Sequence, residues 1–246
     1  MTPRDLLDLF DHTYVINLPE RADRRRDMHK QLQVTGVGAA SDILSTRVEF
    51  VPGVRPAEAA PFGSVGVKGC FLSHLAVLNA ALLGGFESVM ILEDDAEFEG
   101  NVAEIVPRLE EAILRQDWGI VQLGYLPMTE ELPTVDGALV PFRGDVQGLH
   151  CYAVHRKALV PLIGHFERQL AGRAGDDIYG PMAADGTVNT FAWVNHDVPR
   201  HLLVPSICRQ RSSRSDISPA PLDRIPFTRA LVAMARRARR MVRQGR

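Results

Sequence analysis

The chain has 246 residues, of which 46% are hydrophobic and 24% charged, and its net charge is −2. This length and ordinary composition exclude disordered, collagen-like and disulfide-scaffold proteins and leave room for one large α/β domain or two small ones. The stretch from Arg224 to Arg246 holds eight arginines and no acid, so 20 basic residues face 30 acidic ones in the rest of the chain. An acidic body argues against nucleic-acid binding by the domain itself.

The spacing of the cysteines and the hydropathy of the chain indicate in which cellular compartment the protein works. Cys70, Cys151 and Cys208 lie far apart, and no two cysteines form a CxxC pair. This spacing argues against a disulfide framework or metal knuckle and fits reduced thiols. The acidic N-terminus does not resemble a signal peptide, and no stretch approaches about 20 apolar residues. We therefore expect a cytoplasmic protein without a membrane span.

The first half of the chain predicts strands that alternate with helices. Such alternation is typical of a mostly parallel central sheet covered by helices. In chain order we expect a strand at 13–20, a helix at 21–36, a strand at 46–54, a helix at 68–85, a strand at 88–92, a helix at 101–116 and a strand at 118–124.

Beyond residue 130 the pattern is looser. Residues 147–170 predict a strand that runs into a helix, and residues 171–222 are loop-rich, with short elements around "DDIYGPMAADG" and "RHLLVPSI". No internal repeat or linker is visible. We expect one α/β domain over residues 1–222 with an irregular C-terminal half, followed by a basic tail over residues 223–246.

An acidic triplet, Glu93, Asp94 and Asp95, follows the apolar run "VMIL". Ligands of open α/β sheets bind at the carboxyl ends of strands. Because side chains alternate in an extended backbone, we expect Glu93 and Asp95 on one side and Asp94 on the other. Two carboxylates at that position suit Mn²⁺ or Mg²⁺. A solvated turn is the alternative, since further acids follow at Glu97 and Glu99.

Five segments resemble the motifs of glycosyltransferase family 25, in the order of that family. They are "YVINLPERADRRRDM", "GCFLSHLAVL", "VMILEDDAEF", "GLHCYAVHRKAL" and "VPSICRQRSSRSDI", and they span residues 13–217. The family includes lipooligosaccharide and collagen galactosyltransferases. The resemblance implies a GT-A-like fold, a nucleotide-sugar donor that is usually UDP-linked, a divalent metal and inversion at the anomeric carbon.

The first motif is expected to bind the nucleotide. Asn17 and Leu18 end the first strand, and Arg21 and Arg24 follow close behind. Guanidinium groups suit phosphate oxygens. The alternative for each arginine is a solvated helix face with Asp23 as an ion-pair partner.

The second and third motifs supply the remaining donor and metal residues. Gly69 permits close backbone approach. Ser73 and His74 are expected near a helix start, where free N–H groups attract phosphate. His74 is equally consistent with a structural role, and Cys70 is expected in the core. Glu93 and Asp95 are the expected metal ligands, with Asp94 as a further donor-binding residue.

An inverting transfer needs one general base. Asp177 and Asp176 in "GDDIYG" are the candidates, because adjacent acids raise each other's pKa. A helix N-cap is the alternative role for these aspartates. Asp216 is a further residue that could approach the sugar or metal, or cap a turn.

Three histidines, His150, His196 and His201, are candidate third metal ligands, with a structural role as the alternative. In the tail, apolar residues recur at a spacing of four and three among arginines, as in a basic amphipathic helix. Such a helix suits an anionic bilayer. Packing on the acidic body and a disordered end are the alternatives.

Together these features predict a metal-dependent inverting glycosyltransferase. It would move a hexose, most simply galactose, from a UDP-sugar to a glycan or glycolipid acceptor such as lipooligosaccharide or capsule. It would work in the cytoplasm, with residues 224–246 on the inner face of the membrane, and without nucleic acid. The alternative function is a non-catalytic nucleotide-sugar or glycan-binding module of the same fold.

Overall fold

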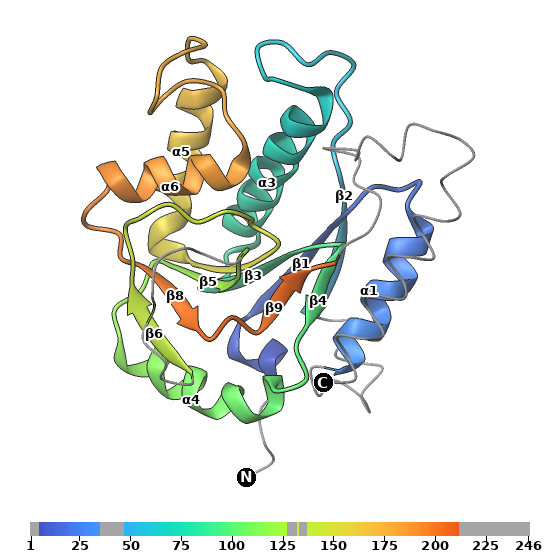
Figure 1. Cartoon of the computed structure of the whole chain (residues 1–246), viewed down its shortest axis with the longest axis vertical. Coiled ribbons are helices and arrows are strands. Elements are labelled where there is room, and N and C mark those ends of the chain that lie inside the picture. The colour runs from blue at the N-terminus through green and yellow to red at the C-terminus, as the bar shows by residue number, and fades with distance from the viewer. Residues whose placement is uncertain (1–4, 35–46, 127–131, 133–136, 212–246) are drawn as a thin grey trace.

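The computed structural model describes residues 5–34, 47–126, 132 and 137–211. Within this part of the chain, a nine-stranded sheet lies between two layers of helices (Figure 1). The strands are β1 (His12–Asn17), β2 (Val48–Pro52), β3 (Ser88–Glu93), β4 (Ala96–Phe98), β5 (Ile120–Gly124), β6 (Ala138–Pro141), β7 (Cys151–His155), β8 (Arg200–Val204) and β9 (Cys208–Gln210). The helices are the short 3₁₀ helix η1 (Leu6–Leu9), α1 (Ala22–Val34), α3 (Val65–Gly84), α4 (Val102–Arg115), α5 (Arg156–Leu170) and α6 (Ala184–Val194).

The strand order is β2-β1-β3-β7-β5-β8-β6, and β9 joins β5 to β4 at one end of the sheet. β1 pairs in parallel with both β2 and β3, and β5 pairs in parallel with β8 and β9. β7 runs antiparallel to both of its neighbours, while β6 and β4 run antiparallel to β8 and β9. The predicted α/β class with a mostly parallel sheet is confirmed.

Two apolar cores cover the two faces of the sheet. Along β3, Val89 and Ile91 pack with α3, α5 and α6, whereas Met90 and Leu92 pack with η1, α1 and α4. This alternation follows from the period of two in a strand, and it explains why a strand buried on both faces is apolar throughout.

The expected elements of the first half are confirmed, with ends that differ by a few residues. The helix expected at 68–85 begins at Val65, where the Ser64 hydroxyl accepts a hydrogen bond from the Val67 N–H at 3.1 Å. It ends at Gly85, whose φ of 72° is left-handed and therefore favours glycine. The predicted strand and helix within residues 147–170 are also confirmed as β7 and α5.

The C-terminal half is more regular than its sequence pattern indicates. α6, β8 and β9 all lie within residues 184–210, and β8 and β9 belong to the central sheet. β4, β6, α6 and β9 were not expected. β4 and β9 have only three residues each, which is too short for a periodic pattern to show.

Helix α3 corrects the expectation that no segment is long and apolar enough to cross a membrane. By length and composition α3 could cross a membrane, although no stretch of that kind was expected. In the structure it packs against α5 and α6 and buries Phe71, His74 and Leu78. The core helix of a globular domain meets the same criterion, so this finding alone does not indicate a span.

Candidate functional site

A pocket of about 330 Å³ opens at the carboxyl ends of β2, β1 and β3. The last residues of β1, the loop after β2, the acidic triplet after β3, one face of α3 and single residues of α1 and β9 line it. This is the edge at which open α/β sheets bind ligands. The lining includes the residues that carry the chemistry of the site: Leu18, Arg24, Gly69, Ser73, His74, Glu93, Asp94, Asp95 and Gln210.

The parallel register of β1 and β3 brings the first and third motifs together. Ile16 lies opposite Glu93, so the residues that follow them, Asn17 at the end of β1 and Asp94 in the turn after β3, also meet. The Asn17 side-chain amide donates a hydrogen bond of 2.7 Å to Asp94 Oδ2. Two motifs that are 77 residues apart in the chain thus form one buried contact.

Arg24 connects α1 to the acidic turn. One of its terminal nitrogens lies 2.6 Å from Asp94 Oδ1 and 3.2 Å from Asp95 Oδ2. Both aspartates are only 6% exposed, so the guanidinium charge offsets two carboxylates in a site of low dielectric. Arg24 also lines the pocket, where its fork suits phosphate oxygens.

The carboxyl group of Asp95 has a raised pKa. Burial first, and then the charge of Glu93, raise its pKa to about 7 despite the nearby Arg24. Gln210 donates a hydrogen bond of 3.4 Å to Oδ2. The other oxygen, Oδ1, is buried and has no hydrogen-bond partner within the described part of the chain.

These features fit a hard divalent cation. Carboxylate oxygens are the ligands that Mn²⁺ and Mg²⁺ prefer, and a buried acceptor without a partner is costly unless a cation or ligand satisfies it. Asp95, with Asp94 beside it, therefore has the chemistry to hold such an ion. The expected pairing of Glu93 with Asp95 on one side is wrong, because the strand ends at Glu93 and a turn carries the two aspartates.

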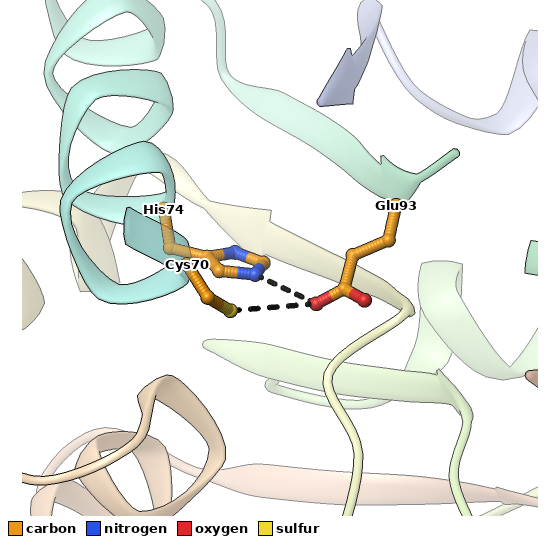
Figure 2. A group of neighbouring side chains, drawn as sticks. All are labelled: Cys70, His74 and Glu93. Carbon is orange, nitrogen blue, oxygen red and sulfur yellow. Dashed lines mark hydrogen bonds and ion pairs between the residues drawn. The ribbon is translucent and has the colours of Figure 1, made fainter. Parts of the chain in front are cut away.

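Glu93 instead turns toward α3 (Figure 2). Its Oε1 lies 3.1 Å from His74 Nε2 and 3.8 Å from Cys70 Sγ. His74 Nδ1 contacts the hydroxyl of the buried Tyr152 at 3.0 Å. Burial raises the pKa of Glu93, but the hydrogen bond and charge of His74 outweigh it, so the net pKa is lowered and the carboxylate is ionised.

Cys70 packs against the hydrophobic core, as expected, and it also lines the pocket. Burial, followed by the charges of Glu93 and Asp185, raises the pKa of its thiol well above the usual value. The thiol is therefore protonated near neutral pH and donates toward Glu93. The signal in the sequence was its spacing of four residues from His74, which places both side chains on one helix face.

Gly69 and Ser73 hold the loop after β2 against α3. Ser73 Oγ accepts the Val54 N–H at 2.8 Å and donates to the Gly69 carbonyl at 2.6 Å. A Cβ on Gly69 would lie 2.5 Å from the Val54 carbonyl oxygen, so only glycine fits. The expectation of close backbone approach at Gly69 agrees with this contact. The expected helix start at Ser73 and His74 is wrong, since both lie in the middle of α3.

Arg211, which the sequence did not single out, holds the acidic turn in place. Its guanidinium donates to the Asp94 carbonyl at 3.0 Å and to Asp27 Oδ2 at 2.6 Å, and its backbone N–H donates to the Asp95 carbonyl at 2.8 Å. The residue connects β9, α1 and the turn. It follows "CRQ" in the fifth motif, but no role for this arginine was expected from the sequence.

Other predicted residues lie away from the pocket lining. Arg21 forms an ion pair of 3.1 Å with Asp23, which is the helix-face alternative. Asp177 and Asp176 lie in an exposed turn after α5, and neither lines the pocket. Asp176 accepts the N–H groups of Ile178 and Tyr179, which lower its pKa, so the expected upward shift is wrong for this residue.

The three candidate histidines do not line the pocket either. His150 is buried with Nε2 3.2 Å from the Cys208 carbonyl, His196 contacts Arg143 at 2.7 Å, and His201 is buried on β8. Asp216 and the tail from residue 223 lie outside the described residues. A nearby acid that the sequence did not single out is Asp185, which accepts the Gly148 N–H at 2.9 Å at the start of α6.

Comparison with known proteins tests the resemblance that the five sequence motifs indicate. The family model described as "Glycosyltransferase family 25 (LPS biosynthesis protein)" matches residues 10–130. The predicted resemblance to glycosyltransferase family 25 is confirmed. The matched residues include the β1 end, the Gly69–His74 face of α3 and the whole acidic triplet, so the family 25 match contains most of the pocket.

Two curated relatives of family 25 show how the names of such relatives differ. "Probable inactive glycosyltransferase 25 family member 3" of Rattus norvegicus is 32% identical over 143 residues, or 52% of this chain and 25% of that protein. "Procollagen galactosyltransferase 1" of Danio rerio is 30% identical over 139 residues, or 50% and 23%. The chain thus spans about a quarter of the length of these relatives.

A solved structure of similar outline is the glycosyltransferase involved in glycosylation of the major capsid of PBCV-1. It is 10% identical with a TM-score of 0.46, and the match covers 82% of this chain and 93% of that one.

Proposed function

We propose that the chain is a family 25 glycosyltransferase that moves a hexose from a nucleotide sugar to a glycan acceptor, with a divalent cation at Asp95. One observation supports this most directly. The pocket brings two buried aspartates and Arg24 together at the carboxyl edge of the parallel strands. A pocket of about 330 Å³ lies within the range of small-ligand sites.

The residues of the pocket have separable roles in this proposal. Asp95 and Asp94 hold the cation, which, when bound, offsets the negative charge of the donor diphosphate. Arg24 binds phosphate oxygens with its guanidinium fork. Asn17 orients Asp94 through its hydrogen bond of 2.7 Å. The loop from Gly53 to Pro56 closes the side of the pocket near β2.

The finer assignments follow from the relatives' names and the tail. The name procollagen galactosyltransferase supports galactose as the sugar, and the family description supports a lipopolysaccharide-type acceptor. UDP as the donor nucleotide and inversion come from the family resemblance. The arginine-rich tail would place the enzyme on the inner face of the membrane, which flotation of the full chain with anionic liposomes, against a chain ending at residue 223, would test.

The catalytic base is the least defined part of the proposal. Asp177 stays a prediction, since the exposed turn that carries it would reach the acceptor only if the acceptor extends beyond the pocket. Asp185 is closer to the chemistry, because its charge acts on the pocket residue Cys70. Replacing each aspartate by asparagine and comparing kcat would choose between them, because loss of a general base costs roughly 10²- to 10⁴-fold.

A non-catalytic module of the same fold is the second candidate. The observation that favours it is the word "inactive" in the names of several relatives. In that case the pocket would bind a nucleotide sugar without cleaving it, and the aspartates would serve affinity alone.

Hydrolysis of UDP-galactose with added Mn²⁺ tests the two candidates. We expect Mn²⁺-stimulated release of UDP by the native chain and a loss of about 100-fold or more in Asp95→Asn, because the cation site is then removed. Glu111→Gln, at an exposed ion pair with Arg115 on α4, is the matched control and should retain the rate. Binding of UDP-galactose without release, at any cation concentration and with any acceptor, would favour the module.

A further inference from the structure

Cys70, His74 and Glu93 form a cluster of three different ligand types on the α3 side of the pocket (Figure 2). Their sulfur, nitrogen and oxygen atoms all lie within 4.8 Å of one another. Cys70 and His74 are one helical turn apart on α3, and Glu93 comes from the end of β3. The cation proposed above requires Asp95 and Asp94, so the roles of Cys70 and His74 are not explained by it.

We propose that this cluster is a second metal site, which binds a soft or borderline divalent cation of the Zn²⁺ class. The three side chains would be its protein ligands, and a fourth position would open into the pocket that all three line. A site with three protein ligands and one open position is the usual form of zinc sites that contact a substrate or water.

The distances between the ligand atoms are close to those expected around a single tetrahedral ion. With Zn–S near 2.3 Å and Zn–N and Zn–O near 2.1 Å, the ligand atoms of a tetrahedral site lie roughly 3.4–3.6 Å apart. The Glu93 oxygen lies 3.1 Å from the His74 nitrogen and 3.8 Å from the Cys70 sulfur. These two distances lie within a few tenths of an ångström of the tetrahedral values, and the Cys70 sulfur and the His74 nitrogen lie within 4.8 Å of each other, so side-chain rotation would have to bring them closer.

Tyr152 supports His74 as a metal ligand. A histidine that binds a metal through one nitrogen usually donates the other N–H to a fixed acceptor. Here the Tyr152 hydroxyl lies 3.0 Å from Nδ1, and a hydroxyl can donate or accept. It can therefore serve the tautomer in which Nε2–H donates to Glu93, and equally the tautomer in which Nε2 is free to bind an ion.

Charge and softness separate the two cation sites. A thiolate and a carboxylate with a neutral histidine bring two negative charges, which balance one divalent ion in a buried place. Binding releases the Cys70 proton, so affinity rises with pH. Sulfur and nitrogen ligands favour Zn²⁺, whereas the all-carboxylate site at Asp95 and Asp94 favours Mn²⁺ or Mg²⁺.

Cobalt substitution tests this site without reference to enzymatic activity. Co²⁺ added to the full chain should give a thiolate-to-cobalt charge-transfer band in the near ultraviolet. Zn²⁺ should abolish that band, whereas excess Mg²⁺ should not. Cys70→Ser should lose the band, and His74→Gln should weaken Zn²⁺ binding by more than about 100-fold in a competition with a chromogenic chelator.

Asp95→Asn is the matched control from the same pocket. It should keep the cobalt band and lose Mn²⁺ binding, measured by electron paramagnetic resonance of the free ion, while Cys70→Ser should do the reverse. Absence of the band in the native chain overturns the second site and identifies a hydrogen-bonded network only. A band that persists in Cys70→Ser also overturns it, because the thiolate must then belong to Cys151 or Cys208. Retained Mn²⁺ binding in Asp95→Asn would instead contradict the first site, so the two failures are distinguishable.

Discussion

At the scale of single residues, the pocket combines groups that are unfavourable for folding. The carboxyl group of Asp95 is 6% exposed, and one of its oxygens has no hydrogen-bond partner in the described chain. Arg24 and Gln210 offset only part of the cost, because the pKa of Asp95 remains raised to about 7. Such conflicts are common at binding sites, where a ligand supplies the missing interaction.

Asp95→Asn should therefore stabilise the metal-free protein while it abolishes cation binding. The folded pKa lies near 7 and the usual value near 3.8, so ionisation of Asp95 lowers the free energy of unfolding increasingly from pH 4 to pH 7. At pH 8 we expect a gain of about 1–3 kcal/mol in chelator-treated protein, and a smaller gain at pH 5. Urea unfolding of both proteins at the two pH values measures the difference; a loss of stability at pH 8 would contradict the expectation.

His165 makes the opposite contribution where α5 packs against α6. It is fully buried in α5, contacts Thr190 Oγ1 at 2.9 Å, and has a pKa lowered to about 4 by burial and by Arg168. The unfolded chain takes up a proton near pH 6.5 while the folded chain does not. Stability from the neutral imidazole is thus fully present above pH 6.5 and is lost as the pH falls toward 4.

We expect the wild type to lose about 1–2 kcal/mol more than His165→Gln between pH 7 and pH 5. Urea unfolding at both pH values measures this, and glutamine at position 165 keeps a hydrogen-bonding side chain without a titration. Parallel losses in the two proteins would show that His165 does not titrate on unfolding.

At the scale of elements, the pocket depends on how closely the loop after β2 approaches α3. Gly69 makes that approach feasible, and Ser73 secures it through two hydrogen bonds. Val54, Arg55 and Pro56 of the loop line the pocket. The helix therefore positions this wall of the pocket as well as supplying His74 and Cys70.

Gly69→Ala should push the loop away from α3, because its Cβ would lie 2.5 Å from a backbone oxygen. We expect a loss of about 1–3 kcal/mol in stability and weaker donor binding. Gly164→Ala in α5 is the matched control: its Cβ would meet nothing within 4 Å, and alanine in a helix adds up to about 1 kcal/mol. Thermal unfolding and UDP titration measure both effects, and equal stability changes in the two variants would refute the steric argument.

At the scale of the whole molecule, the C-terminal half is tied to the sheet by a buried arginine. Arg200 on β8 is 4% exposed and donates to Asn189 Oδ1 at 2.8 Å, to the Phe142 carbonyl at 3.2 Å and to the Gly144 carbonyl. It thereby connects β8 with α6 and with the chain after β6. Burial lowers its pKa to about 10, so it stays charged at neutral pH.

Arg200→Met keeps a long apolar stem and removes the donors, so the part-buried carbonyls of Phe142 and Gly144 lose this partner, while Asn189 Oδ1 retains the Val146 N–H. We expect a loss of about 3 kcal/mol or more in the free energy of unfolding. Mn²⁺ binding should persist, because none of the pocket residues contacts Arg200. Urea unfolding with and without Mn²⁺ measures both; a loss below 1 kcal/mol would mean that water replaces the guanidinium.

The sequence predicted the first half of the fold well, and the reason is local. Alternating strands and helices such as β1, α1, β3 and α4 have clear apolar periods, and Gly85 marks the end of α3, whereas the start of α3 after Ser64 was placed three residues too late. β4 and β9 could not be predicted in this way, because three-residue strands are defined by their pairing with each other. α6 follows a loop-rich stretch, so its helical periodicity was not recognised in the sequence.

The sequence predicted many of the residues that form the candidate site, but not how these residues contact one another. Placing the acidic triplet and Asn17 at the ends of two strands needed only the sequence and the rule that ligands bind at that edge. That Glu93 turns to His74 while Asp94 and Asp95 share Arg24 depends on where β3 stops and the turn begins. Cys70 and Arg211 gained their roles only from residues that lie far away in the chain.

By itself, then, the sequence determined the α/β class, the resemblance to glycosyltransferase family 25 and the motifs that meet at one edge of the sheet, because strand periodicity and parallel pairing are properties of short segments. Only the tertiary structure decided which carboxylate faces which partner, which thiol lies in the pocket and which arginine anchors the acidic turn. Those outcomes depend on packing between segments up to 184 residues apart, as in the contact of Asp27 with Arg211, and no local pattern records them.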